Sequence, residues 1–342
     1  MGRRILIIVS AVVLLASGSS CKRNPYNINI KGSEVTVSIS RLEQELFTLS
    51  PGSLQDSIGY LKEKYGSFLK YFSYVINIGS VTDPAWSNGL NQFCTDKFNN
   101  EVYGSVLSVF PGTETLEKEL SGAFSRYRYY FPAMAVPSVY TCITGFNNSI
   151  ITGDSVLGIS LDRYLGAECR YYRQIGIYRY QAAKMTPLNI ASDCIYGWAS
   201  SEWDFSTLGY QRDNVLNSMI HEGKLLYFAK CMLPETNDEL IFGFSEPQLK
   251  FCRKNEGRMW QYLIENNLLF NSEQLTKKKL TGEAPFTSYF SSESPGRAAA
   301  WIGFRIVESY MHKNRGVSLE ELMKETDVQG ILEKAKYHPP AG

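Results

Sequence analysis

Histidine is scarce in this sequence, which contains only three such residues among 342: His221, His312 and His338. Catalytic zinc sites usually combine two or three histidines, or a histidine pair with a carboxylate. A three-histidine site would need every histidine in the chain. The count therefore argues against histidine-rich metal chemistry.

An excess of positive charge is also missing. The chain has 35 Lys and Arg against 34 Asp and Glu, for a net charge of +1. Proteins that bind nucleic acid normally carry a basic excess, so a nucleic-acid partner is not expected. Hydrophobic residues make up 44% and charged residues 20% of the chain, which is typical of a globular protein and excludes an intrinsically disordered one.

Closely paired cysteines are absent as well. No two cysteines have C-x-x-C spacing, so neither a zinc ribbon nor a thioredoxin-type site is indicated. Six cysteines follow Cys21, and in an exported protein six cysteines allow 15 disulfide pairings. The alternative is that some of them are buried thiols. These cysteines are Cys94, Cys142, Cys169, Cys194, Cys231 and Cys252.

The first segment has the pattern of an export signal. Two arginines in Met1–Arg4 precede an apolar run over 5–16, and small polar residues lead to Cys21. The run is too short for a membrane span. A cysteine directly after small residues predicts a bacterial lipoprotein signal over 1–20 with acyl chains, such as palmitate, on Cys21. Three acyl chains would anchor the protein stably. An ordinary signal peptide with a chance cysteine is the alternative.

The rest of the chain shows mostly helical periodicity. Residues 21–35 are polar and rich in asparagine, which predicts a tether, and residues 36–342 are expected to form a single domain. Apolar residues at three- and four-residue spacing predict helices, and alternating residues predict strands. The helices are expected at 41–49, 53–74, 86–99, 113–130, 188–199, 213–231, 247–266, 295–312 and 319–334, and the strands at 35–39, 138–144, 149–151 and 156–161.

The predicted fold class is α+β and mostly α. A helical part over 40–135 and a second helical part over 187–335 flank strands over 138–162. Two of these strands are separated by a Gly153-Asp154 turn, which is typical of a hairpin. The sequence therefore predicts a helix-rich domain with a small antiparallel hairpin sheet.

Candidate functional side chains are most concentrated in the string from Met219 to Phe228. It contains His221-Glu222, which resembles the start of the zincin motif H-E-x-x-H. That motif works because residues four apart share one helix face, so two imidazoles can hold Zn²⁺ beside the glutamate. Here the second histidine position is Leu225, which cannot bind a metal. The alternative is an ordinary helix face that carries one histidine and one glutamate without a catalytic role.

A second resemblance uses the same residues differently. The string 222–228, Glu-Gly-Lys-Leu-Leu-Tyr-Phe, is similar to the downstream glutamate block of gluzincin peptidases, and the helix 296–310 resembles that branch too. The resemblance implies a histidine pair about 25 to 35 residues upstream. The stretch 188–196 contains no histidine. The resemblance therefore implies a zincin-type fold that has lost its metal ligands and holds no metal or other cofactor.

Several strings spread along the chain resemble the Bacteroidetes gliding-motility lipoprotein GldB family. They are Cys21 with its signal, 157–166, 219–227, Leu233-Pro234 with Asp238, 284–286, 293–303 and 336–339. The resemblance implies an envelope lipoprotein that serves gliding and the associated type IX secretion machinery. It implies anchoring at the outer membrane, on the periplasmic face, and other envelope or motility lipoproteins as partners.

Two function classes follow from these patterns. The expected one is a non-catalytic structural or regulatory protein, in which Glu222 and Lys224 pair with groups such as Arg297 or Asp162. The competing one is a periplasmic peptidase or other hydrolase, with catalytic candidates His221, Glu222, Lys224 and Arg297. A peptidase needs His221 and Glu222 to converge in a cleft with a third polar group. A third class, a carbohydrate- or peptide-binding lipoprotein, would place tyrosines and tryptophans around an open groove.

Overall fold

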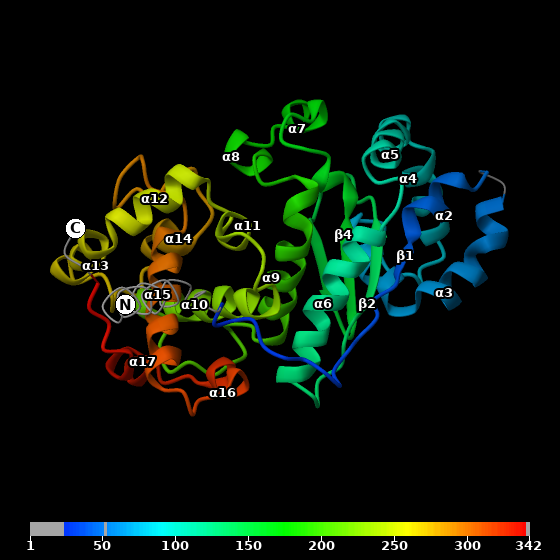
Figure 1. The fold of residues 1–342 in the computed structure, drawn as a ribbon. Coiled ribbons are helices and arrows are strands. Elements are labelled where there is room, and N and C mark those ends of the chain that lie inside the picture. The colour runs from blue at the N-terminus through cyan, green and yellow to red at the C-terminus, as the bar shows by residue number, and fades with distance from the viewer. Residues whose placement is uncertain (1–23, 51–52, 340–342) are drawn as a thin grey trace, which may run out of the picture.

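A small β-sheet stands between two groups of helices (Figure 1). The structure is a computed structural model that describes residues 24–50 and 53–339. The predicted signal over 1–20 and the predicted acylation site Cys21 lie outside the described residues. The helix-rich α+β class expected from the sequence is confirmed.

The sheet has four strands, and most of their pairings are parallel. β1 (Ile39–Arg41), β2 (Ser138–Cys142), β3 (Ile150–Gly153) and β4 (Val156–Ser160) form the order β1-β2-β4-β3. β3 and β4 pair antiparallel, as the hairpin prediction required, but β1–β2 and β2–β4 are parallel. The prediction of an antiparallel sheet is therefore wrong for two of the three pairings. Helices connect β1 to β2, and such long crossovers allow parallel strands.

Each face of the sheet is covered by helices. On one face α3 (Ser53–Val75) packs so closely that Gly153 and Gly158 leave room for the rings of Tyr71 and Phe68. The other face joins the larger core, which includes α6 (Glu114–Tyr130) and α9 (Ile190–Glu202). Alternate residues of a strand point to opposite faces, which is how β4 serves both cores.

Several predicted helices are divided in the structure. The range 86–99 contains α4 (Trp86–Thr95) and the start of α5 (Lys97–Val109), because Asp96 caps a new helix by accepting a hydrogen bond from the N–H of Asn99. The range 247–266 divides at Asn255 into α12 (Glu246–Lys254) and α13 (Glu256–Glu265). The range 319–334 divides into α16 (Leu319–Lys324) and α17 (Val328–Ala335), and Asp327 caps the latter.

The remaining elements surround a pair of central helices. α10 (Val215–Met232) crosses and packs against α15 (Ala298–Lys313). The short helix α2 (Leu42–Thr48) lies within the helix predicted at 41–49. Apolar periodicity did not predict the other short elements, which are α7 (Arg170–Gln174), α8 (Arg179–Ala182), α11 (Asp238–Phe242), α14 (Gln274–Thr281) and the 3-10 turns η1 (Leu161–Tyr164) and η2 (Pro187–Asn189).

The backbones of α10 and α15 touch at two glycines. A Cβ at Gly303 would overlap the carbonyl oxygen of Met219, and a Cβ at Gly223 would overlap the backbone of Gly303. Both helices are apolar over most of their surface, as expected for helices inside a core. The two glycines therefore set how closely the helices approach.

An extended strap over residues 24–38 joins the two groups of helices. The N–H groups of Val35, Val37 and Ile39 donate to side chains on α6, in that order to Ser125, Ser121 and Glu117. Two extended residues and four helical residues both span about 6 to 7 Å, so the two repeats match. This explains why the strand predicted at 35–39 is wrong: the segment is extended but pairs with helix side chains, and strand pairing begins at Ile39.

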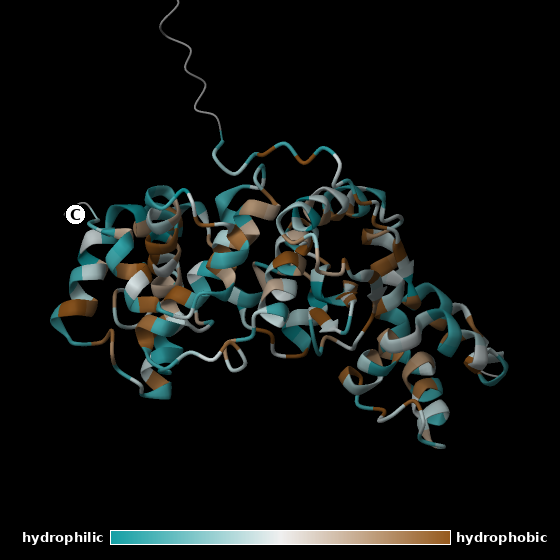
Figure 2. Ribbon diagram, turned by 90° about the horizontal axis from the view of Figure 1, so that it is seen from below, coloured by the Kyte–Doolittle hydropathy of each residue, from teal (hydrophilic) through white to brown (hydrophobic). Residues whose placement is uncertain are grey.

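The hydrophobic core runs across both groups of helices. One cluster extends from Tyr26 to Ala335 and includes the inner faces of β4, α6, α9, α10 and α15. A smaller cluster lies between the sheet and α2–α4. Figure 2 shows hydrophobic residues interleaved with hydrophilic ones along helices of both groups.

The six cysteines of the described residues are free thiols, and five of them are buried. Burial raises the pKa of the Cys94 and Cys252 thiols to about 12. Such thiols are protonated at neutral pH and act as small apolar side chains. Of the two alternatives left open by the sequence, buried thiols match the structure.

We expect the glycine contact to control stability. Gly303→Ala should lower the free energy of unfolding by about 2 to 4 kcal/mol, because the added methyl group forces α10 and α15 apart. Gly104→Ala on α5 is the matched control, since no atom lies within 4 Å of its Cβ position. It should be neutral or stabilising by up to about 1 kcal/mol. Urea unfolding curves of both variants measure the difference, and equal effects would contradict the close-contact argument.

Candidate functional site

The string 219–228 lies on α10, which is buried on nearly every side. Asn214 caps the start of the helix by accepting a hydrogen bond from the N–H of Asn217. His221 is 5% exposed and Lys224 is 0% exposed. These two side chains are therefore inside the protein, where each needs a partner, and Glu222 is partly exposed.

His221 sits in an aromatic pocket. Its Nδ1 lies 3.2 Å from the hydroxyl of Tyr210, and its ring meets Phe205 edge to face at 5.2 Å. Burial lowers the pKa of His221 to about 4. The imidazole is therefore neutral at physiological pH, and its hydrogen-bond partner is a phenol.

Glu222 faces a different set of neighbours. Its Oε2 accepts hydrogen bonds from the hydroxyl of Tyr196 at 2.5 Å and from the guanidinium of Arg297 at 2.7 Å. Adjacent residues on a helix point about 100° apart, which separates this carboxylate from the pocket of His221. The two side chains do not converge on one point.

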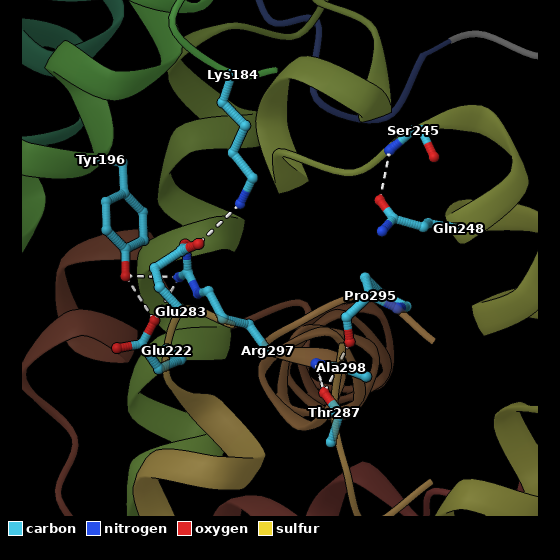
Figure 3. A network of polar contacts seen from close by, with 10 residues as sticks. All are labelled: Lys184, Tyr196, Glu222, Ser245, Gln248, Glu283, Thr287, Pro295, Arg297 and Ala298. Carbon is cyan, nitrogen blue, oxygen red and sulfur yellow. Dashed lines mark hydrogen bonds and ion pairs between the residues drawn. The ribbon is translucent and has the colours of Figure 1, made fainter. Parts of the chain in front are cut away.

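Arg297 is the centre of a chain of charged side chains (Figure 3). Its guanidinium contacts Glu222 at 2.7 Å and Glu283 at 3.1 Å, and Glu283 in turn contacts Lys184 at 2.9 Å. The guanidinium also lies 5.0 Å from the ring centre of Tyr196. Burial opposes the charge of Arg297, but Tyr196 and the two carboxylates outweigh it and raise its pKa above the ordinary value.

A tight turn before α15 holds Arg297 in place. Arg297 has φ of 61°, in the left-handed region, and a Cβ at Gly296 would overlap the carbonyl oxygen of Ala284. The Thr287 hydroxyl donates to the carbonyl of Pro295 at 2.8 Å and accepts from the N–H of Ala298 at 3.0 Å. The turn therefore aims the guanidinium at α9 and α10.

Lys224 caps the end of another helix. Its Nζ donates to the carbonyl oxygens of Met323 at 3.1 Å and Glu325 at 2.9 Å, at the end of α16. It also lies 5.2 Å from the ring centre of Tyr210. Burial lowers the pKa of Lys224 to about 7. These contacts give hydrogen-bond donors to carbonyls at the helix terminus that have no donor within the helix itself.

The pairing expected from the sequence is confirmed for Glu222 with Arg297 and is wrong for Asp162. Asp162 lies next to the sheet and accepts hydrogen bonds from the N–H groups of Thr144 and Phe146. Lys224 pairs with carbonyls. The sequence did not indicate Tyr196 or Glu283, since neither stands in a motif.

A cavity of about 390 Å³ opens at the Lys184 end of the charged chain. Its wall includes Ser245 and Gln248, which form a capping box at the start of α12, and Pro295 and Gly296. His221 and Glu222 do not line it. Among residues 24–50 and 53–339, no group of three or more His, Cys, Asp or Glu side chains could hold a metal ion.

We expect the Arg297 network to stabilise the fold. Arg297→Met should lower the free energy of unfolding by about 3 kcal/mol, because it leaves Glu222 without its cation and takes from Glu283 one of its two cations. Lys324→Met is the control, since its pair with Glu320 is exposed on α16 and should contribute about 0.5 kcal/mol or less. Thermal and urea unfolding measure both. A loss for Arg297→Met no larger than for Lys324→Met would contradict this role.

We also expect His221 to make stability depend on pH. The folded state keeps its pKa near 4, whereas the unfolded chain takes up a proton near pH 6.5. Stability supplied by the neutral ring is therefore lost as pH falls from about 6.5 to 4, by up to about 3 kcal/mol. His221→Gln should remove this loss.

The measurement is the difference in urea unfolding free energy between wild type and His221→Gln across that pH range. Glu222, Lys224 and Asp204 also act on the ring, and both proteins contain them. A difference that does not change with pH would show that His221 is not held neutral.

Comparisons with known proteins assign the family. The family model described as gliding motility protein GldB matches residues 23–339. No curated protein and no solved structure matches the chain, so the resemblance to zinc peptidases remains a prediction. The match spans nearly all of the described residues and includes α10, the Arg297 turn and the strap. The chain therefore belongs to the GldB family of gliding motility proteins.

Proposed function

We propose that this protein is a lipid-anchored envelope protein with a non-catalytic structural or regulatory role in gliding motility and the associated type IX secretion machinery. The family gives it a role in gliding motility. In this proposal, acyl chains on Cys21 hold it at the periplasmic face of the outer membrane. Other envelope or motility lipoproteins are its partners.

The hydrogen bonds of Glu222 are the main observation in support of a non-catalytic role. A water-activating glutamate must face a substrate or a metal-bound water. Glu222 is instead bound by Arg297 and Tyr196. The guanidinium at 2.7 Å and the phenol hold the carboxylate within the protein's own hydrogen-bond network.

The placement of His221 supports the same interpretation. A general base needs a proton donor from the substrate or a nucleophile within reach. The hydroxyl near its Nδ1 belongs to Tyr210, and the ring packs against Phe205. The peptidase or hydrolase alternative would need both residues to leave these partners.

The anchoring part depends on the sequence. The lipoprotein pattern ends at Cys21, and the described chain begins three residues later at Asn24. No helix in the described part of the chain has the length and apolar character needed to cross a membrane. Attachment by acyl chains supplies the membrane contact in this proposal.

Variants in a gliding host separate the two function classes. Cys21→Ser should abolish or strongly reduce colony spreading and secretion, because the protein loses its anchor. His221→Gln should keep both at wild-type protein level, because a scaffold does not use the ring chemically. Colony spreading, secreted cargo and immunoblots of membrane fractions are the measurements.

Two results would overturn the proposal. One is His221→Gln protein at wild-type level in cells that neither glide nor secrete. The other is stoichiometric zinc in the mature protein purified without chelator, which would favour a peptidase. Full gliding by Cys21→Ser would instead refute the anchor alone.

A further inference from the structure

A groove of about 870 Å³ lies between the strap and the C-terminal end of the fold. Tyr26 from the strap forms one wall, where its ring meets Tyr227 edge to face at 5.6 Å and its hydroxyl donates to Glu308 at 2.6 Å. The second half of α15 and the residues after α17 form the other walls. The groove is therefore made where the two ends of the described chain meet.

Positive charge gathers in this groove. Arg305, Lys313, Arg315 and Lys336 line it, as do His312 and His338. Two carboxylates also line it, Glu256 and Glu308. With both histidines neutral, four cations against two carboxylates leave a local charge of +2, whereas the whole chain carries only +1.

The carboxylates are already engaged by protein groups. Arg305 contacts both Glu256 and Glu308, and Tyr337 and Tyr26 donate a hydrogen bond to one carboxylate each. Lys313 donates to the carbonyls of Ala335 and Lys336, which are neutral. Lys313 contributes its charge to the groove without a carboxylate of its own in these contacts.

The groove lies close to the proposed anchor. Pro25 lines it and stands four residues after Cys21. Four extended residues span at most about 14 Å, so the groove must lie within that reach of an acylated cysteine. At physiological salt charges act over about 8 Å, and a tether this short lets the rim of the groove approach the membrane surface to within that distance.

We propose that this groove binds the phosphate-bearing headgroup of an anionic phospholipid in the leaflet that holds the anchor. The inference rests on the acylation of Cys21 included in the proposed function. Arg315 and Lys336 are exposed at the rim and meet the phosphate. The contact fixes which face of the protein lies against the membrane.

The test uses the mature chain with Cys21→Ser, which cannot be acylated, and vesicles of stated composition. This unacylated protein should bind vesicles that contain phosphatidylglycerol and bind vesicles of phosphatidylcholine alone far more weakly. Its affinity for the phosphatidylglycerol vesicles should fall as the salt concentration is raised. Arg315→Gln and Lys336→Gln should each weaken binding about fivefold.

The matched control removes the same charges elsewhere. Lys70 on α3 and Lys118 on α6 are exposed cations away from the groove. Lys70→Gln with Lys118→Gln should leave vesicle binding unchanged. Circular dichroism melting curves confirm that every variant folds.

Three results would overturn the groove as a headgroup site. They are no preference for phosphatidylglycerol, no effect of Arg315→Gln and Lys336→Gln, or an equal effect of the control pair. Failure of the anchor is measured separately, by mass spectrometry of the mature N-terminus from cells. An unmodified Cys21 refutes the anchoring part of the proposed function, on which this inference rests, whatever the vesicles show.

Discussion

The contact between α10 and α15 at Gly223 and Gly303 is the constraint on which most of this structure depends. Two helices whose backbones touch leave no room for adjustment, because packed interiors tolerate neither gaps nor overlaps. The contact fixes the position of Glu222, which is next to Gly223 in the chain. It also fixes the start of α15, where Arg297 stands.

The charged groups inside the protein follow from that geometry. Burying a carboxylate or a cation costs free energy unless it finds a partner. Glu222 finds Arg297, Lys224 finds the carbonyls at the end of α16, and His221 stays neutral beside Tyr210. His221, Glu222 and Lys224 thus each join α10 to a different neighbour, and together they hold the helices around α10 in place.

Long periodic segments and one charge pair could be predicted from the sequence. Five long helices repeat apolar residues at helical spacing, so the sequence predicts them: α3, α6, α9, α10 and α15. The pair of Glu222 with Arg297 was expected as well. Helix breaks at Asp96, Asn255 and Asp327 were missed, since a polar cap within an otherwise periodic range leaves the apolar pattern intact. Partners such as Tyr196 and Glu283 come from tertiary packing, which local patterns do not encode.

The strap has a consequence for the order in which the protein matures. Asn24 donates a hydrogen bond to the carbonyl of Pro234, and Tyr26 donates one to Glu308, at sequence separations of 210 and 282 residues. Closing such long loops comes late, because distant segments must first be present and placed. Because a chain is synthesised from its N-terminus, the first segment to emerge is thus the last to dock. Until α15 has followed, Tyr26 has no Glu308 to bind, so the strap stays undocked until the C-terminal half of the chain has folded.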